Sequence, residues 1–104
     1  MRPKLTFILL LALSTTNAIA QSYLELNEKM VSLYKAANYQ EASEAGLAAL
    51  VACEEEYGKD HEEYLFSLQN LAIIYNKLEE PEKALEYYDL AIITYEKVLP
   101  NALE

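Results

Sequence analysis

A similarity between the two halves of the chain constrains its fold more than any other feature. Shifting the sequence by 42 positions against itself aligns a segment that begins near residue 22 with one that begins near residue 64. Apolar positions agree along both copies, as with Val31 and Ile73. An internal repeat of this kind indicates an array of supersecondary units packed on one another. The identical pairs are Leu26 and Leu68, Lys35 and Lys77, Ala42 and Ala84, Glu44 and Glu86, Ala49 and Ala91, and Glu54 and Glu96.

Each copy has the pattern of two helices. Apolar residues recur at helical spacing, and between residues 21 and 99 the only helix breakers are two glycines and Pro81. The pattern predicts helices at about 23–37, 40–57, 61–79 and 81–99, paired as repeat one (about 22–58) and repeat two (about 61–99). The expected fold class is all-α, built from antiparallel helix pairs. The apolar stripe of the second helix in each pair holds small residues: Ala42, Ala45, Ala49, Ala84 and Ala91.

The second pair, "LQNLAIIYNKLEEPEKALEYYDLAI", resembles a tetratricopeptide repeat. The first pair matches this family less closely, because Lys29 stands where the family has leucine and Gly46 where it has an aromatic residue. Such departures are typical of an end repeat. The resemblance implies two repeats that form a short right-handed α-solenoid. Tyr75, Tyr88 and Tyr95 fall on apolar stripes, which predicts positions in the core or between repeats. The residues at family positions are Leu68, Leu71, Ala72, Tyr75, Ala84, Tyr88 and Ala91.

The period of 42 residues is longer than the family's usual period of about 34. This length and the segment "YGKDHEEYLFSLQNLAIIY" resemble the kinesin-light-chain type of the family, which has longer helices and a Gly-x-x-His linker. Gly58 and His61 stand at the glycine and histidine of that linker. The resemblance extends over residues 22 to 99.

His61, the single histidine, lies among acidic residues in "EYGKDHEEYL". With Glu62 it begins like a zinc-peptidase helix, but that motif needs a second histidine one turn later, where this chain has Leu65. We expect a hinge between the two helix pairs instead. Gly58 would close one helix, Asp60 would N-cap the next with Glu63 completing a capping box, and His61 would face solvent in the first turn.

We predict no catalytic residue, no metal and no cofactor, and therefore a protein that is not an enzyme. Cys53 lies on the inner stripe of its helix, which predicts a buried and inert thiol. As the single cysteine it cannot form an internal disulfide.

Residues 1–20 are expected to form a secretory signal peptide. Arg2 and Lys4 precede an apolar run that is too short to span a bilayer, which needs about 20 residues. The segment ends in Ala18-Ile19-Ala20, a pattern that signal peptidase cleaves. We therefore expect an exported bacterial protein, periplasmic or secreted, with its repeat domain at residues 21–104.

The repeat domain is strongly acidic. Without Arg2 and Lys4, six lysines remain against 17 acidic residues, which takes the net charge from −9 to −11. Such a surface repels nucleic acid and anionic membranes, because both are bound through positive charge. We expect neither as a partner once the signal peptide is removed.

The resemblance implies a non-catalytic module that binds a peptide or helix of a partner protein in a concave groove. Amide side chains in the groove could meet a peptide backbone, and Lys35 and Lys77 could contact a carboxylate of the partner. The alternative for both lysines is a solubilising role at exposed helix ends. Transferred position by position, the groove residues are Leu24, Asn27, Val31, Tyr34, Lys35, Phe66, Gln69, Ile73, Asn76 and Lys77.

The fourth predicted helix leaves Leu85, Ile92 and Ile93 without a following helix to cover them. Three arrangements would account for this: the front part of a longer solenoid, a homodimer formed through the open C-terminal end, or four helices that are stable alone. Two other functions stay open. The chain could be the repeat portion of a longer exported enzyme, such as a caspase-like peptidase, or a self-assembling structural module.

Overall fold

The computed structural model describes residues 21–99 of the 104-residue chain. This part contains four α-helices: α2 (Tyr23–Lys35), α3 (Tyr39–Tyr57), α4 (Glu62–Lys77) and α5 (Pro81–Val98). All four predicted helices are confirmed, and their ends lie within two residues of the predicted ones. The predicted signal peptide lies outside the described residues.

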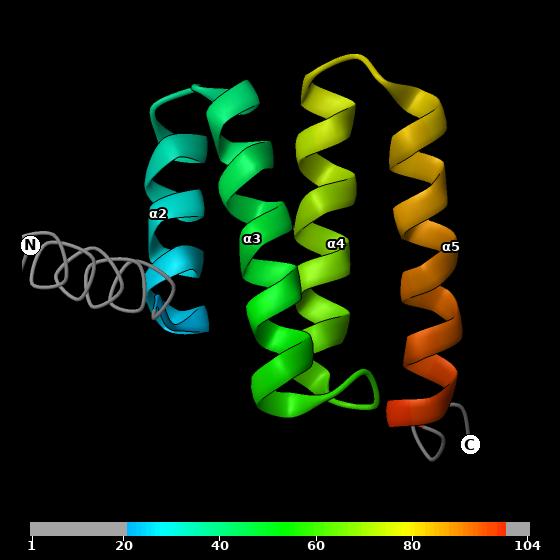
Figure 1. Cartoon of the computed structure of the whole chain (residues 1–104). Coiled ribbons are helices and arrows are strands. Elements are labelled where there is room, and N and C mark those ends of the chain that lie inside the picture. The colour runs from blue at the N-terminus through cyan, green and yellow to red at the C-terminus, as the bar shows by residue number, and fades with distance from the viewer. Residues whose placement is uncertain (1–20, 100–104) are drawn as a thin grey trace, which may run out of the picture.

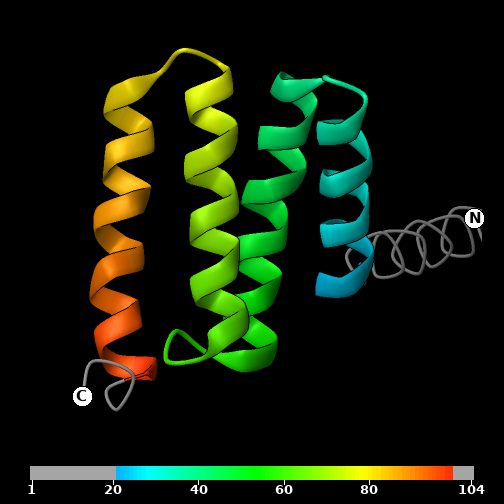
Figure 2. The same ribbon diagram turned by 180° about the vertical axis from the view of Figure 1, so that it is seen from behind.

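The helices run alternately up and down, and each packs against its neighbour in sequence (Figure 1). The view from behind shows the same order, with α3 between α2 and α4 (Figure 2). Short connections join α2 to α3 and α4 to α5, so each repeat is an antiparallel helix pair. This arrangement confirms the predicted all-α solenoid.

The helices α2 and α4 end in the same way, two residues earlier than predicted. After α2, Ala37 adopts a left-handed backbone with φ 62°. The Ala37 N–H donates to the Tyr34 carbonyl at 3.0 Å, and the Asn38 N–H donates to the Leu33 carbonyl at 2.9 Å. These two bonds define a Schellman motif. After α4, Glu79 repeats the motif with φ 60°, and the bonds run from Glu79 to Asn76 and from Glu80 to Tyr75.

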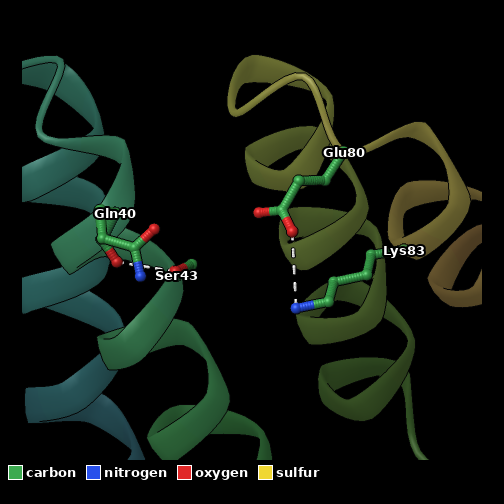
Figure 3. Close-up of polar contacts among 4 residues, drawn as sticks. All are labelled: Gln40, Ser43, Glu80 and Lys83. Atoms are coloured by element: carbon green, nitrogen blue, oxygen red, sulfur yellow. Dashed lines mark hydrogen bonds and ion pairs between the residues drawn. The ribbon is translucent and has the colours of Figure 1, made fainter.

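The second helices, α3 and α5, begin at equivalent places in the two repeats and are held locally by different contacts (Figure 3). Near the start of α3, the Ser43 hydroxyl donates to the Gln40 carbonyl at 2.7 Å. Near the start of α5, Lys83 Nζ lies 3.5 Å from Glu80 Oε1. Pro81 occupies the first turn of α5, where its missing N–H costs nothing.

Buried alanines and one glycine let the helices pack closely. Ala42, Ala49, Ala84 and Ala91 are all buried, as the small-residue stripes predict. In α3, a Cβ added to Gly46 would lie 2.9 Å from Leu71 Cδ2 and 3.2 Å from Met30 Sδ. Side chains from α2 and α4 therefore occupy the space above Gly46, which explains why this repeat has no aromatic residue there.

The three tyrosines on the predicted apolar stripes differ in burial. Tyr75 is buried as predicted, and its ring stacks on Tyr87 with 5.5 Å between centroids. Tyr95 is half-buried. Tyr88 does not lie in the core of the described chain, because its ring is exposed on a face of α5 that no helix of the described chain covers.

Tyr23 joins α2 to the two helices that follow. Its hydroxyl donates to Glu63 Oε2 at 2.9 Å and accepts from the Ser67 hydroxyl at 3.4 Å, so it reaches α4. Its backbone N–H donates to Glu56 Oε2 of α3 at 2.6 Å. Burial raises the pKa of Tyr23 to about 12, and the Glu63 carboxylate beside it adds to the rise. Tyr23 therefore contributes to the stability of the first repeat in its protonated form.

Candidate functional site

The segment around His61 is a helix junction. The prediction that Asp60 caps α4 is wrong: His61 is the N-cap, and its Nδ1 accepts from the Glu63 N–H at 3.0 Å. The His61 ring also lies against the Tyr57 ring, with 4.6 Å between centroids. Glu63 forms no capping box, because its carboxylate accepts the bond from Tyr23. Gly58 supports the junction with φ 84°, a backbone conformation that residues with a Cβ rarely adopt.

Metal and thiol chemistry find no support in the described residues. Between residues 21 and 99, no cluster of histidine, cysteine and acidic side chains is arranged to hold a metal ion. Cys53 is fully buried, as predicted, and burial raises the pKa of its thiol. A buried protonated thiol is a poor nucleophile.

Two parallel rows of side chains follow α2 and α4 on one face. In each row, two apolar residues stand seven positions apart and a lysine follows four positions after the second. Because 3.6 residues make one turn, residues at this spacing share a helix face. The apolar members are exposed. The rows are Leu24, Val31 and Lys35 on α2, and Phe66, Ile73 and Lys77 on α4.

A hollow of about 250 Å³ lies between the two rows. Its floor is apolar, because the buried side chains of Met30 and Ile74 meet there. Val31 and Ile73 line it and are 37% and 40% exposed. Four predicted groove residues thus come together, since the complete lining is Met30, Val31, Tyr34, Lys35, Asn70, Ile73 and Ile74.

Asn70 is a lining residue that the sequence analysis missed. The predicted groove residues stand at positions known from the family, and Asn70 is not at one of them. A signal was present, since Asn70 is a polar residue in the apolar segment "LQNLAII". Its amide offers the hollow both a hydrogen-bond donor and an acceptor.

The other predicted groove residues do not line this hollow, although Asn27 lines an adjoining one together with Val31 and Lys35. Asn27 is half-buried, and its Oδ1 is enclosed without a hydrogen-bond partner among the described residues. Gln69 faces a different hollow, beside α5. Asn76 and Lys77 are exposed at the end of α4. The hollow between α2 and α4 does not include these residues or Leu24 and Phe66, so the structure does not bring the ten predicted residues into one site.

Lys35 is the one charged residue that lines this hollow. Within residues 21–99, ion pairs join Lys59 to Glu54 and Lys83 to Glu80, and neither involves Lys35 or Lys77. Lys83 also lies 5.3 Å above the Tyr75 ring. Lys35 is therefore available to a bound group in a way that Lys83 is not.

The described helices have no membrane-spanning candidate: within residues 21–99, none combines the length and apolar character needed to cross a bilayer. The fold defines a class, a helical repeat protein, and its first helices α2 and α4 line a hollow.

The comparisons identify the family. A family profile described as tetratricopeptide repeat matches residues 11–97, which is most of the chain, so the protein belongs to the tetratricopeptide repeat family. The comparisons with curated proteins and with solved structures gave no match. Repeats of this family generally mediate protein–protein interaction. The kinesin-light-chain type stays a prediction.

Proposed function

We propose that this protein is a non-catalytic module that binds a peptide or helix of a partner protein across α2 and α4. The observation that carries the proposal is the hollow of about 250 Å³ between these helices, with its apolar floor and a single lysine at its edge. Sites for drug-sized molecules usually span about 300–1,000 Å³ and bury most of the ligand. A smaller hollow open to the surface better suits one side chain of a longer segment.

The apolar rows supply the driving force for binding. Val31 and Ile73 are each more than a third exposed, and Leu24 and Phe66 extend the rows toward the other end of the helices. Covering apolar surface contributes about 25 cal/mol per Å². A partner segment with one apolar side chain in the hollow and others along the rows would therefore remove both rows from water.

The charges of the chain limit the kind of partner segment that can bind. Lys35 and Lys77 stand one turn beyond Val31 and Ile73, so the segment would place a carboxylate at that end. The chain as a whole is strongly acidic, with a net charge of −9, and would repel a polyacidic segment. A mostly apolar segment with one carboxylate, such as a C-terminus, fits both conditions.

The test is selection of peptide ligands from a displayed library of C-terminal and internal segments, followed by titration of the selected peptides. A 1:1 complex that weakens at least tenfold in Val31→Gln/Ile73→Gln and in Lys35→Glu/Lys77→Glu supports the proposal. The control is Val51→Gln/Ile93→Gln, which changes two apolar positions on α3 and α5 that are more exposed than Val31 and Ile73. Selected peptides that bind all variants equally would refute the site.

We also propose that the protein is exported. The basic start, apolar run and Ala18-Ile19-Ala20 pattern support cleavage after Ala20. Intact-mass and N-terminal sequencing of the protein expressed in a bacterium test this, with a mature chain beginning at Gln21 as the expected result. A protein that retains Met1 and stays in the cytoplasm would contradict it.

A further inference from the structure

A stripe of apolar residues along α5, here named the α5 stripe, has a centre that no helix of the described chain covers, while its last members, Tyr95 and Leu99, are half-buried against α4. Its members follow one another at steps of four, three, four, three and four residues, which is the heptad spacing of helices that pack side by side. Leu85 and Ile92, at its centre, are 61% and 58% exposed. The α5 stripe consists of Pro81, Leu85, Tyr88, Ile92, Tyr95 and Leu99.

The first repeat indicates what normally lies on such a stripe. The positions of α3 that correspond to the centre of the α5 stripe after the 42-residue shift face α4. Leu50 packs there against the buried clusters that contain Leu68 and Leu71 of α4, and Gly46 lies under Leu71. The same positions of α5 are Ile92 and Tyr88. A helix therefore covers this face in repeat one, and the equivalent face in repeat two is open.

The α5 stripe also borders a hollow. A space of about 310 Å³ opens beside it, toward α4, and is lined by Gln69, Tyr88, Ala91, Ile92, Tyr95 and Glu96. Ala91 is buried and forms its floor. A large side chain from a covering helix would enter here, as Leu71 fills the space above Gly46 in the first repeat.

The charges beside the α5 stripe discriminate between occupants. Glu82, Asp89 and Glu96 are exposed and recur every seven residues along its outer edge. A second copy running antiparallel would place these acids against one another, with Asp89 facing its own equivalent. Residues 21–99 also hold 16 of the 17 acidic residues but six of the eight basic ones, so the net charge of each copy opposes their association. Lysine or arginine residues of a partner helix, placed beside the α5 stripe, would instead be attracted to these acidic residues.

From these observations we propose that the α5 stripe binds an amphipathic helix of another protein whose apolar face is flanked by lysine or arginine. The partner helix lies along α5, inserts one large apolar side chain beside Ala91, and places its basic flank against Glu82, Asp89 and Glu96. This surface is distinct from the hollow between α2 and α4, so the two can be occupied independently.

The probes are two labelled synthetic helical peptides of about 21 residues, three heptads with leucine at both seam positions. One carries lysine at the flanking positions and the other carries glutamate. Fluorescence anisotropy with the full chain is expected to show at least tenfold tighter binding of the lysine peptide than of the glutamate peptide. This difference in affinity should decrease as the salt concentration increases. Leu85→Gln/Ile92→Gln should weaken binding at least tenfold.

Control variants test whether the peptide binds at the α5 stripe. Ile93→Gln alters an apolar residue next to Ile92 that is similarly exposed but lies off the α5 stripe, and it should leave binding unchanged. Val31→Gln/Ile73→Gln changes the lining of the hollow between α2 and α4 and should also leave binding of the lysine peptide unchanged. Glu82→Lys/Asp89→Lys should reverse the preference in favour of the glutamate peptide. Circular dichroism checks that each variant is folded.

Several results would overturn the proposal. These are equal binding of both peptides, binding of neither, loss of binding in Ile93→Gln, and a preference that survives Glu82→Lys/Asp89→Lys. Sedimentation of the full chain at rising concentration tests the second copy as occupant. A dimer that Leu85→Gln/Ile92→Gln abolishes would show that the stripe binds another copy, and would also refute the inference.

Discussion

Replacing Ala37 by glycine should stabilise this protein, although the change removes a methyl group and adds flexibility to the unfolded chain. Ala37 has φ 62° and follows the end of α2 in a Schellman motif. Its methyl group is exposed, so no packing is lost. Both hydrogen bonds of the motif are made by the backbone and persist in the variant.

The magnitude follows from two opposing terms. A left-handed backbone costs an L-residue about 1–2 kcal/mol, which glycine does not incur. Glycine loses about 0.4–1 kcal/mol through the greater freedom of the unfolded chain. We expect a net gain of about 0.5–1 kcal/mol, which for a domain of this size raises the melting temperature by about 2–8 °C. Glu79→Gly, at the equivalent position after α4, should add a similar gain.

The assay is thermal and urea unfolding followed by circular dichroism. Ala36→Gly is the matched control, because Ala36 is the preceding exposed alanine and has φ −81°. This variant gains no relief of strain and should lower the free energy of unfolding by about 0.5–1 kcal/mol. A melting temperature that Ala37→Gly leaves unchanged or lowers, or that Ala36→Gly raises equally, would refute the reasoning.

Three further predictions concern alkaline pH, packing and the junction. Because the pKa of Tyr23 rises to about 12 on folding, its unfolded form ionises first, so stability should hold below pH 10 and fall between pH 10 and 12; a urea midpoint that is the same at pH 9 and pH 11 contradicts this. Gly46→Leu should destabilise the protein by about 1–3 kcal/mol, because Leu71 and Met30 leave no space for a side chain. The control Ala48→Leu, on the exposed side of α3, should be nearly neutral. Equal urea midpoints of the two variants would argue against close packing at Gly46. His61→Ala should cost about 0.5–2 kcal/mol through the lost cap and leave peptide affinity unchanged; a large loss in a titration would assign His61 to the site.

Local patterns predicted the helices well and their ends less well. The predicted helices ran past Lys35 and Lys77, because the left-handed residues that follow are Ala37 and Glu79 rather than glycine. At the junction, the prediction gave Glu63 a local role in a capping box. Its carboxylate instead accepts a hydrogen bond from Tyr23, which is 40 residues away, and His61 is the N-cap of α4. A short sequence window contains no information about such a distant partner.

The sequence alone determined the repeat, the number of helices, the buried alanines and the uncovered apolar residues of α5. These features depend on helical periodicity within each segment and on comparison of the two copies, so no distances between helices are needed. The burial of Cys53 followed from the same periodicity.

Only the tertiary structure decided which predicted groove residues meet. Val31, Tyr34, Lys35 and Ile73 surround one hollow, whereas Gln69 faces α5 and the Asn27 oxygen is enclosed. The separation of α2 and α4 depends on how both pack on α3, where Met30 and Leu71 approach Gly46. Periodicity places a residue on a face of its own helix, but the distance between two such faces is set by the side chains packed between them.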